Sequence, residues 1–245
     1  MLNTLLFGVV ASSALVIGAV AGAYWSPPRH LLAAALAFAS GALMSALAFD
    51  LFEESFRASG AWLSGIGLVG GAVTFVVADA LLDRYIAEGG SNVMAPNSAF
   101  ALLAAVTLDG IPENIALGVS LLEATGSGAL ALLFAIFASN LPEALGGAVG
   151  MREQGRSKVF VIGVWAATAV LLAAAVMIGN GALKGVSEAM GVMSEELVAV
   201  MLSFAGGAVL ASLANTLMPD AYREGGRLVA FATAAGFLLS FLISQ

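Results

Sequence analysis

The chain alternates between long apolar runs and short clusters of Pro, Gly and charged residues. These clusters leave eight apolar segments, at residues 2–24, 31–52, 61–82, 97–122, 129–150, 158–179, 195–218 and 228–244. Each segment has roughly the 20 residues that an α-helix needs to cross the hydrocarbon core of a bilayer. None shows the alternating pattern of a membrane β-barrel strand. The pattern predicts an all-α integral membrane protein with about eight transmembrane helices.

Composition supports a membrane protein. The chain is 60% hydrophobic and 10% charged, with a mean hydropathy of +1.00, whereas soluble domains carry about 25% charged residues. The connections are short, so we expect one transmembrane transporter domain over residues 1–245. Segment 2–24 has no basic residue before Arg29, so we expect a retained first span and not a signal peptide.

Basic residues predict how the chain is oriented. Eight spans place both termini on one side of the membrane. The opposite side collects seven basic residues, Arg29, Arg84, Arg152, Arg156, Lys158, Arg223 and Arg227, against Arg57 and Lys184 on the side of the termini. Short cytoplasmic loops are enriched in Lys and Arg. We therefore expect both termini to be external, in a multi-pass protein of the plasma or inner membrane.

Two stretches of the chain resemble each other. Residues 38–60 and 204–226 share 9 of 23 positions without gaps, including Arg57 with Arg223 and Gly60 with Gly226. They belong to the second and seventh segments, which cross the membrane in opposite directions. Inverted repeats are typical of transporter folds. The expected plan is 3+2+3, with inverted repeats of helices 1–3 and 6–8; chance similarity of Ala- and Leu-rich spans is the alternative.

Segments four and five each carry a polar-x-Pro-Glu unit inside an apolar run. One contains Asp109-Gly110-Ile111-Pro112-Glu113, and the other contains Ser139-Asn140-Leu141-Pro142-Glu143. Asp109 and Glu113 share a helix face at a spacing of four, as do Asn140 and Glu143 at a spacing of three. The short loop between the segments makes them antiparallel neighbours, so their Pro-Glu units are expected to meet near the middle of the membrane.

These acids need a partner. A carboxylate inside a bilayer costs about 2.5 kcal/mol or more by insertion scales, and neither segment contains Lys or Arg. Each Pro also frees a backbone carbonyl one turn earlier, at Leu108 and Ala138. A bound cation would balance the charge, and oxygen ligands of these kinds suit hard divalent metals. The alternative is a set of protonated acids that serve helix packing.

Other acids lie nearer the ends of the segments. Asp50 is either a cation entrance or a solvated end of segment two. Asp79, Asn215 and Asp220 are either part of an exit or interfacial residues.

At these residues the chain resembles the ZIP (Zrt/Irt-like) family of divalent-metal transporters. Asp109 to Glu113 is similar to the family's His-Asn-x-Pro-Glu motif, and Ser139 to Glu143 is similar to its second metal motif. The resemblance implies eight spans and a two-metal site in the transport path. Glu113 and Glu143 match the family's glutamates, Asp109 falls at its helix-four His position, and Ser139 and Asn140 fall at helix-five ligand positions.

The chain departs from the family where imidazole is expected. Asp109 replaces the helix-four His, Gly110 replaces the adjacent Asn, and Ser139 replaces a stronger ligand. Imidazole suits zinc well, so its loss predicts a harder site. The second metal position has Gly110 and only Asn140 as a ligand, so we expect one effective metal. Zinc stays open as the substrate through carboxylates, and Fe(II) and Mn(II) become more plausible. No resident cofactor is expected.

We therefore expect a transporter that moves a divalent metal by alternating access. The alternatives are a carrier of protons or organic cations that uses the same carboxylates, and a membrane protein that does not transport. An enzyme is not expected, since the sequence has neither a His-Glu-x-x-His nor a Gly-x-Ser-x-Gly motif. The expected partners are the metal and the bilayer, not nucleic acid, and a homodimer stays open. With no Cys in the chain, disulfides are excluded.

Overall fold

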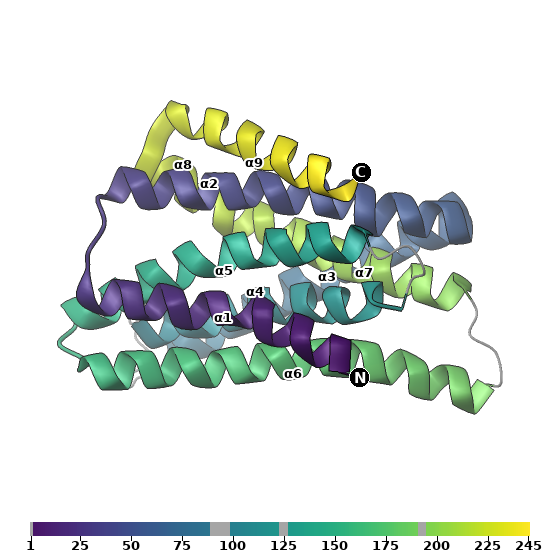
Figure 1. Cartoon of the computed structure of the whole chain (residues 1–245), viewed down its shortest axis with the longest axis horizontal. Coiled ribbons are helices and arrows are strands. Elements are labelled where there is room, and N and C mark those ends of the chain that lie inside the picture. Colours follow the sequence, from purple (N-terminus) through teal and green to yellow (C-terminus); the bar gives the residue numbers. More distant parts are fainter. Residues whose placement is uncertain (1, 89–98, 123–126, 191–194) are drawn as a thin grey trace.

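The computed structural model describes residues 2–88, 99–122, 127–190 and 195–245, which form an all-helical bundle (Figure 1). No strand occurs in these ranges, so the predicted all-α class is confirmed. The α-helices are α1 (Leu2–Tyr24), α2 (Arg29–Ala46), α3 (Glu54–Glu88), α4 (Ala99–Ser120), α5 (Ser127–Glu153), α6 (Lys158–Met190), α7 (Glu195–Ser212), α8 (Met218–Gly225) and α9 (Val229–Ser244). Two π-helices, η1 (Leu47–Glu53) and η2 (Leu213–Leu217), and the 3-10 turn η3 (Gly226–Leu228) connect some of them.

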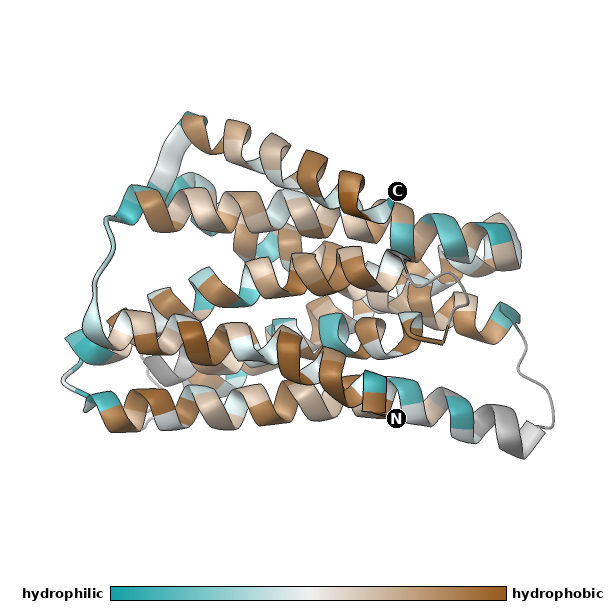
Figure 2. Cartoon of the chain, viewed as in Figure 1, coloured by the Kyte–Doolittle hydropathy of each residue, from teal (hydrophilic) through white to brown (hydrophobic). Residues whose placement is uncertain are grey.

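Several of these helices are long and apolar enough to span a membrane. Within the described residues, five continuous stretches meet that description: Leu2–Tyr24, Arg29–Ala87, Gly128–Glu153, Lys158–Ala182 and Glu195–Ser244. Figure 2 shows hydrophobic residues along the lengths of the helices and hydrophilic residues gathered toward the ends of the bundle. The N- and C-termini lie toward the same end (Figure 1).

Two of those stretches are too long for one crossing. Arg29–Ala87 has 59 residues, which would extend about 90 Å as one helix, against about 30 Å of hydrocarbon. The chain turns at Gly60, whose φ of 75° favours glycine. Ser55 and Ser64, nine residues apart, are joined across this turn by a 3.0 Å hydrogen bond between their hydroxyls. A straight helix would separate them by about 13 Å.

The second long stretch repeats this design. Gly226 has a φ of 62° and aligns with Gly60 in the sequence repeat. The π-helices η1 and η2 also begin at aligned positions, Leu47 and Leu213, with the same offset of 166 residues. The similarity between residues 38–60 and 204–226 therefore extends to two local backbone features that composition alone does not produce.

The closest helix crossings show the same correspondence. Where α3 crosses α7, a Cβ on Gly71 would collide with the carbonyl oxygen of Phe204, and a Cβ on Gly207 would collide with that of Leu68. Such close approach of backbones requires small residues and is typical of packed membrane helices. The missing side chains at Gly71 and Gly207 allow this contact.

The α2–α9 crossing is built in the same way. A Cβ on Gly236 would collide with the carbonyl oxygen of Phe38, and a Cβ on Gly41 would collide with that of Thr233. Phe38 and Gly41 align with Phe204 and Gly207 of the first crossing. The helix α3 thus packs on residues 204–208 of one repeated stretch, and α9 packs on residues 38–41 of the other.

Helix α5 packs against α1, and helix α4 packs against α6. Glycines on α1 approach the backbone of α5, where Gly22 faces the carbonyl of Leu145. Gly179 on α6 approaches the carbonyl of Ile115 on α4 in the corresponding way. Ile115 and Leu145 each lie three residues after the Pro of a Pro-Glu unit, so the α1–α5 and α4–α6 contacts hold the two units in matching positions.

Some helices extend beyond the predicted apolar segments. The segments predicted to end at residues 82 and 179 continue as helix to Glu88 and Met190. Apolar runs predict the length inside a membrane, whereas backbone hydrogen bonds can continue into polar sequence outside it. The first residues of predicted segment 97–122, at positions 97–98, lie outside the described part of the chain.

Two apolar clusters flank the middle of α4 and α5. One lies at the end of the bundle where α4 ends and α5 begins, and includes Leu43, Leu51, Leu117, Leu132, Ile136 and Leu202, all fully buried or nearly so. The other lies toward the opposite end and includes Leu15, Met151, Val161, Trp165 and Leu172. The polar residues of the two Pro-Glu units lie between these clusters.

Candidate metal-binding site

The two prolines lie inside continuous helices, Pro112 in α4 and Pro142 in α5. Around them the bundle buries charged and polar side chains: Asp109 is 6% exposed, Glu113 2%, Ser139 0% and Asn140 1%. Glu143 is half-buried. Burial of such groups is costly unless they are paired or bind a cation.

Three of the acids that the sequence singled out lie close enough for their charges to interact. The carboxylate of Glu143 interacts electrostatically with those of Glu113 and Asp109, and Glu113 interacts with Asp109. The Ser139 hydroxyl lies within reach of Glu113 as well. Three acids from two helices thus share one region of the interior, and their charges repel one another.

Asp109 is fixed by a residue that the sequence did not single out. The Thr216 hydroxyl on η2 lies 3.0 Å from Asp109 Oδ2 and 2.8 Å from the carbonyl of Ser212, so these two acceptors share its one proton. The other oxygen, Oδ1, is buried and has no hydrogen-bond partner among the described residues. A buried carboxylate oxygen without a donor is a candidate ligand atom. Alignment of Thr216 with Asp50 in the repeat was the one sequence signal that could have identified it.

The neighbouring amides are oriented by backbone carbonyls. Asn140 donates from Nδ2 to the Ala11 carbonyl of α1 at 3.4 Å, and Asn114 donates from Nδ2 to the Gly110 carbonyl at 2.8 Å. The Asn114 Oδ1 is buried without a partner in the described structure. Since the amide nitrogens are used in packing, the amide oxygens are the atoms left for a cation.

Ser139 is a weaker candidate in this arrangement. Its hydroxyl donates to the carbonyl of Ile136 at 3.0 Å, so its proton is used within α5 and only its oxygen lone pairs are left for a cation. Within the described residues, no three His, Cys, Asp or Glu side chains form a compact set that could hold a metal ion. A ligand set at this site would therefore draw on amide, hydroxyl or backbone carbonyl oxygens, or on water, besides the carboxylates.

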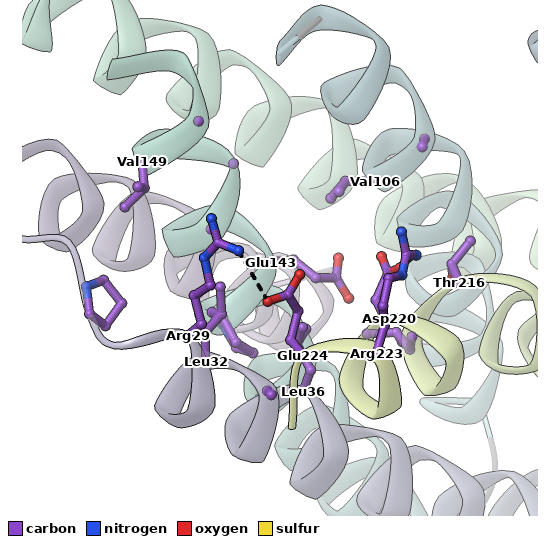
Figure 3. Close-up of a pocket in the computed structure, with 18 of the residues that line it drawn as sticks. Arg29, Leu32, Leu36, Val106, Glu143, Val149, Thr216, Asp220, Arg223 and Glu224 are labelled. Carbon is purple, nitrogen blue, oxygen red and sulfur yellow. Dashed lines mark hydrogen bonds and ion pairs between the residues drawn. The ribbon is translucent and has the colours of Figure 1, made fainter. Parts of the chain in front are cut away.

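A cavity of about 490 Å³ reaches the site from one end of the bundle (Figure 3). Asp109, Glu143 and Thr216 line its inner part, and Arg29, Asp220 and Glu224 line it farther out. The side chain of Arg29 is 88% exposed and lies 3.8 Å from Glu224, which places the mouth at the basic end. Glu113, Ser139 and Asn140 are not part of the lining.

The candidate exit residues separate into two groups. Asp220 lines the cavity and pairs with Arg223. Asn215 instead bonds Asp79 through Nδ2 at 3.4 Å, outside the cavity lining. Asp220 therefore extends the acidic surface that leads from Glu143 to the mouth, whereas Asp79 and Asn215 join α3 to η2.

No protein-family model and no curated protein matches the chain.

Proposed function

We propose that this chain is a ZIP-type transporter that moves a divalent metal across a membrane. One observation carries the proposal: acidic side chains on α4 and α5 lie at the inner end of a cavity in an apolar bundle. No Lys or Arg lies in α4, and in α5 Arg152 lies in the last turn. A cation is the ligand that such a site favours, because it offsets the repulsion between the carboxylates.

The transport path uses eight crossings. The turns at Gly60 and Gly226 divide the two longest apolar stretches into two helices each. Together with α1, α4, α5 and α6, these give eight helical rods. The basic residues Arg29 and Arg223 at the cavity mouth support a cytoplasmic position for that end, so the termini lie outside.

The substrate metal is held by Asp109, Glu113, Asn140 and Glu143, with Ser139 at the edge of the site. Carboxylate and amide oxygens favour Mn(II) or Fe(II) and permit Zn(II). The free Oδ1 of Asp109 supports its role as a ligand. Thr216 is placed to orient Asp109, because its hydroxyl lies 3.0 Å from Oδ2.

The cavity supports an alternating-access mechanism. It connects Asp109 and Glu143 with the basic end, whereas the cluster containing Leu43, Leu117 and Leu132 fills the other end. A site exposed to one side and sealed from the other is one of the two states such a mechanism needs. Inverted repeats supply a route to the second state, because the two halves can exchange their conformations.

A carrier of organic cations or protons is the second candidate. The cavity volume of about 490 Å³ lies within the range of pockets that hold small organic molecules. A divalent metal should raise the melting temperature of the purified protein, because ligands that bind only the folded state stabilise it. Stabilisation by an organic cation alone would favour the second candidate.

The decisive test is flux. Full-length protein in proteoliposomes should accumulate Mn²⁺, Fe²⁺ or Zn²⁺ down a gradient, compared with empty liposomes and with Glu113→Gln/Glu143→Gln protein. Equal fluxes in the three preparations would contradict the proposal.

A further inference from the structure

The inverted repeat relates two pairs of residues that the site description treats separately. Thr216 aligns with Asp50 at the offset that aligns Gly60 with Gly226. On α4 and α5, superposing Pro112-Glu113 on Pro142-Glu143 aligns Asp109 with Ser139. The pair Thr216–Asp109 thus has a counterpart in the sequence, Asp50–Ser139. In the counterpart the π-helix carries the carboxylate, at Asp50, and the Pro-Glu helix carries the hydroxyl, at Ser139.

The first pair is formed in this structure, and the second is not. Both hydroxyls bond a carbonyl of their own helix, Thr216 that of Ser212 and Ser139 that of Ile136. Thr216 in addition lies 3.0 Å from Asp109 Oδ2. Asp50 lies instead at the start of α5, where a Cβ on Gly128 would be 3.2 Å from the Cβ of Asp50. Gly128 precedes Ser139 by eleven residues, which is about 16 Å along a helix.

Asp50 is incompletely satisfied where it lies. Its Oδ2 is buried and, in the described part of the chain, has no hydrogen-bond partner. A buried carboxylate oxygen left in this way is costly. The two repeated π-helices therefore differ at this position. Thr216 on η2 has a side-chain partner on α4, whereas Oδ2 of Asp50 on η1 has none among the described residues.

The residues that line the cavity after Thr216 also have counterparts after Asp50 in the repeat. Leu217, Asp220 and Arg223 line the cavity beyond Thr216, and their repeat counterparts are Leu51, Glu54 and Arg57. Leu51 is fully buried in the apolar cluster that seals the other end. A cavity equivalent to the observed one would open at that end if the two halves exchanged conformations, and Asp50 would lie at its inner part.

We propose that Asp50 is a further metal-binding residue, which meets Ser139 when the site faces the end that bears the termini. In that state its carboxylate and the Ser139 oxygen add hard ligands for a divalent cation beside Glu113. The ion then passes to Asp109 and Glu143 as the site turns to the basic end. This inference rests on the proposed function, since it assigns a residue to the same transported metal.

Cross-linking tests the geometry, because the chain has no native Cys. Asp50→Cys with Gly128→Cys reports the arrangement in this structure, and Asp50→Cys with Ser139→Cys reports the proposed one. Full-length protein in membranes should form both disulfides under mild oxidation, since a disulfide requires Cα atoms within about 7 Å.

The outcomes are distinct. Disulfide formation in the Asp50→Cys/Ser139→Cys protein supports the inference. Cross-linking of the Gly128→Cys pair alone would overturn it, since Asp50 would then never reach Ser139. Failure of both pairs would also overturn it, because the position of Asp50 from which the argument starts would be wrong.

Uptake kinetics test the role as a ligand. Asp50→Asn should raise the KM for Mn²⁺ supplied from the side of the termini roughly tenfold, as loss of a group that supports a metal site does. The matched control is Glu53→Gln on the same π-helix, because Glu53 pairs with Arg57 at 2.5 Å and its counterpart lies outside the cavity lining. An unchanged KM in Asp50→Asn, with wild-type transport intact, would refute this inference alone; absence of metal transport by the wild type would refute the proposed function.

Discussion

Thr216 and Asp109 are joined by a 3.0 Å hydrogen bond between the π-helix η2 and the middle of α4. The bond uses one oxygen of the carboxylate and leaves Oδ1 buried and unpartnered within the described residues. Asp109 also lines the inner part of the cavity beside Glu143. The candidate site therefore presents a held carboxylate with one oxygen available, where a site built around imidazole would present a ring nitrogen.

Replacing Asp109 by His tests its place among the ligands. An imidazole nitrogen is a better ligand for zinc than for manganese, whereas carboxylate oxygen favours manganese. Asp109→His should therefore raise the ratio of Zn²⁺ to Mn²⁺ affinity, measured by competition binding to the purified protein. Thr216→Ser, which retains the hydroxyl, is the matched control and should leave the ratio unchanged. Identical ratios in wild type and Asp109→His would exclude Asp109 from the ligand set.

The paired helix crossings predict matched effects on stability. Gly71→Ala and Gly236→Ala each place a Cβ against a backbone carbonyl, of Phe204 and Phe38 respectively. Overpacking of this kind costs about 1–3 kcal/mol, so both variants should melt at lower temperature. Gly65→Ala is the control, since nothing lies within 4 Å of its added Cβ and Ala favours helix. A melting temperature unchanged in all three variants would contradict the close crossings.

Orientation is tested by labelling. A Cys added after Gln245 would be unique in the chain and should react with a membrane-impermeant thiol reagent on intact cells. A Cys at Glu153, near the basic end, should react only after lysis. Reaction of the C-terminal Cys only after lysis would reverse the orientation predicted from the Lys and Arg distribution.

Much of the fold could be predicted because it depends on long apolar runs. The all-helical class and the antiparallel pairing of α4 and α5 follow from the lengths of those runs and of their connections. The 9 identities between residues 38–60 and 204–226 pointed to features that the backbone shares, the φ-positive Gly60 and Gly226. The continuation of α3 to Glu88 could not be predicted, because polar residues outside a membrane form helix without a hydrophobic signal.

The acids of the candidate site could be picked out from the sequence, but the residue that bonds one of them could not. Asp109 and Glu113 were conspicuous because charge is rare inside apolar segments. Thr216 was not, since a hydroxyl in a span commonly bonds its own helix, as Thr107 does with the carbonyl of Leu103. Only the tertiary contact between η2 and α4 distinguishes Thr216 from such residues.

The central claim is that Glu113 and Glu143 jointly hold the transported ion. They occupy equivalent positions after Pro112 and Pro142, and their charges interact. A metal that binds them must compete with protons, so affinity should fall as pH is lowered. Glu113→Gln and Glu143→Gln keep the side-chain shape and remove one charge each. The single losses in binding should not add, because both residues serve one ion.

The most direct measurement is Mn²⁺ binding and uptake by the folded Glu113→Gln/Glu143→Gln protein in proteoliposomes, with Glu53→Gln as a control that removes an acid paired with Arg57. Each single variant should bind and transport strongly less than wild type, and the double variant should do neither while keeping its helical circular dichroism. Metal-dependent uptake that persists in the folded double variant would contradict the account.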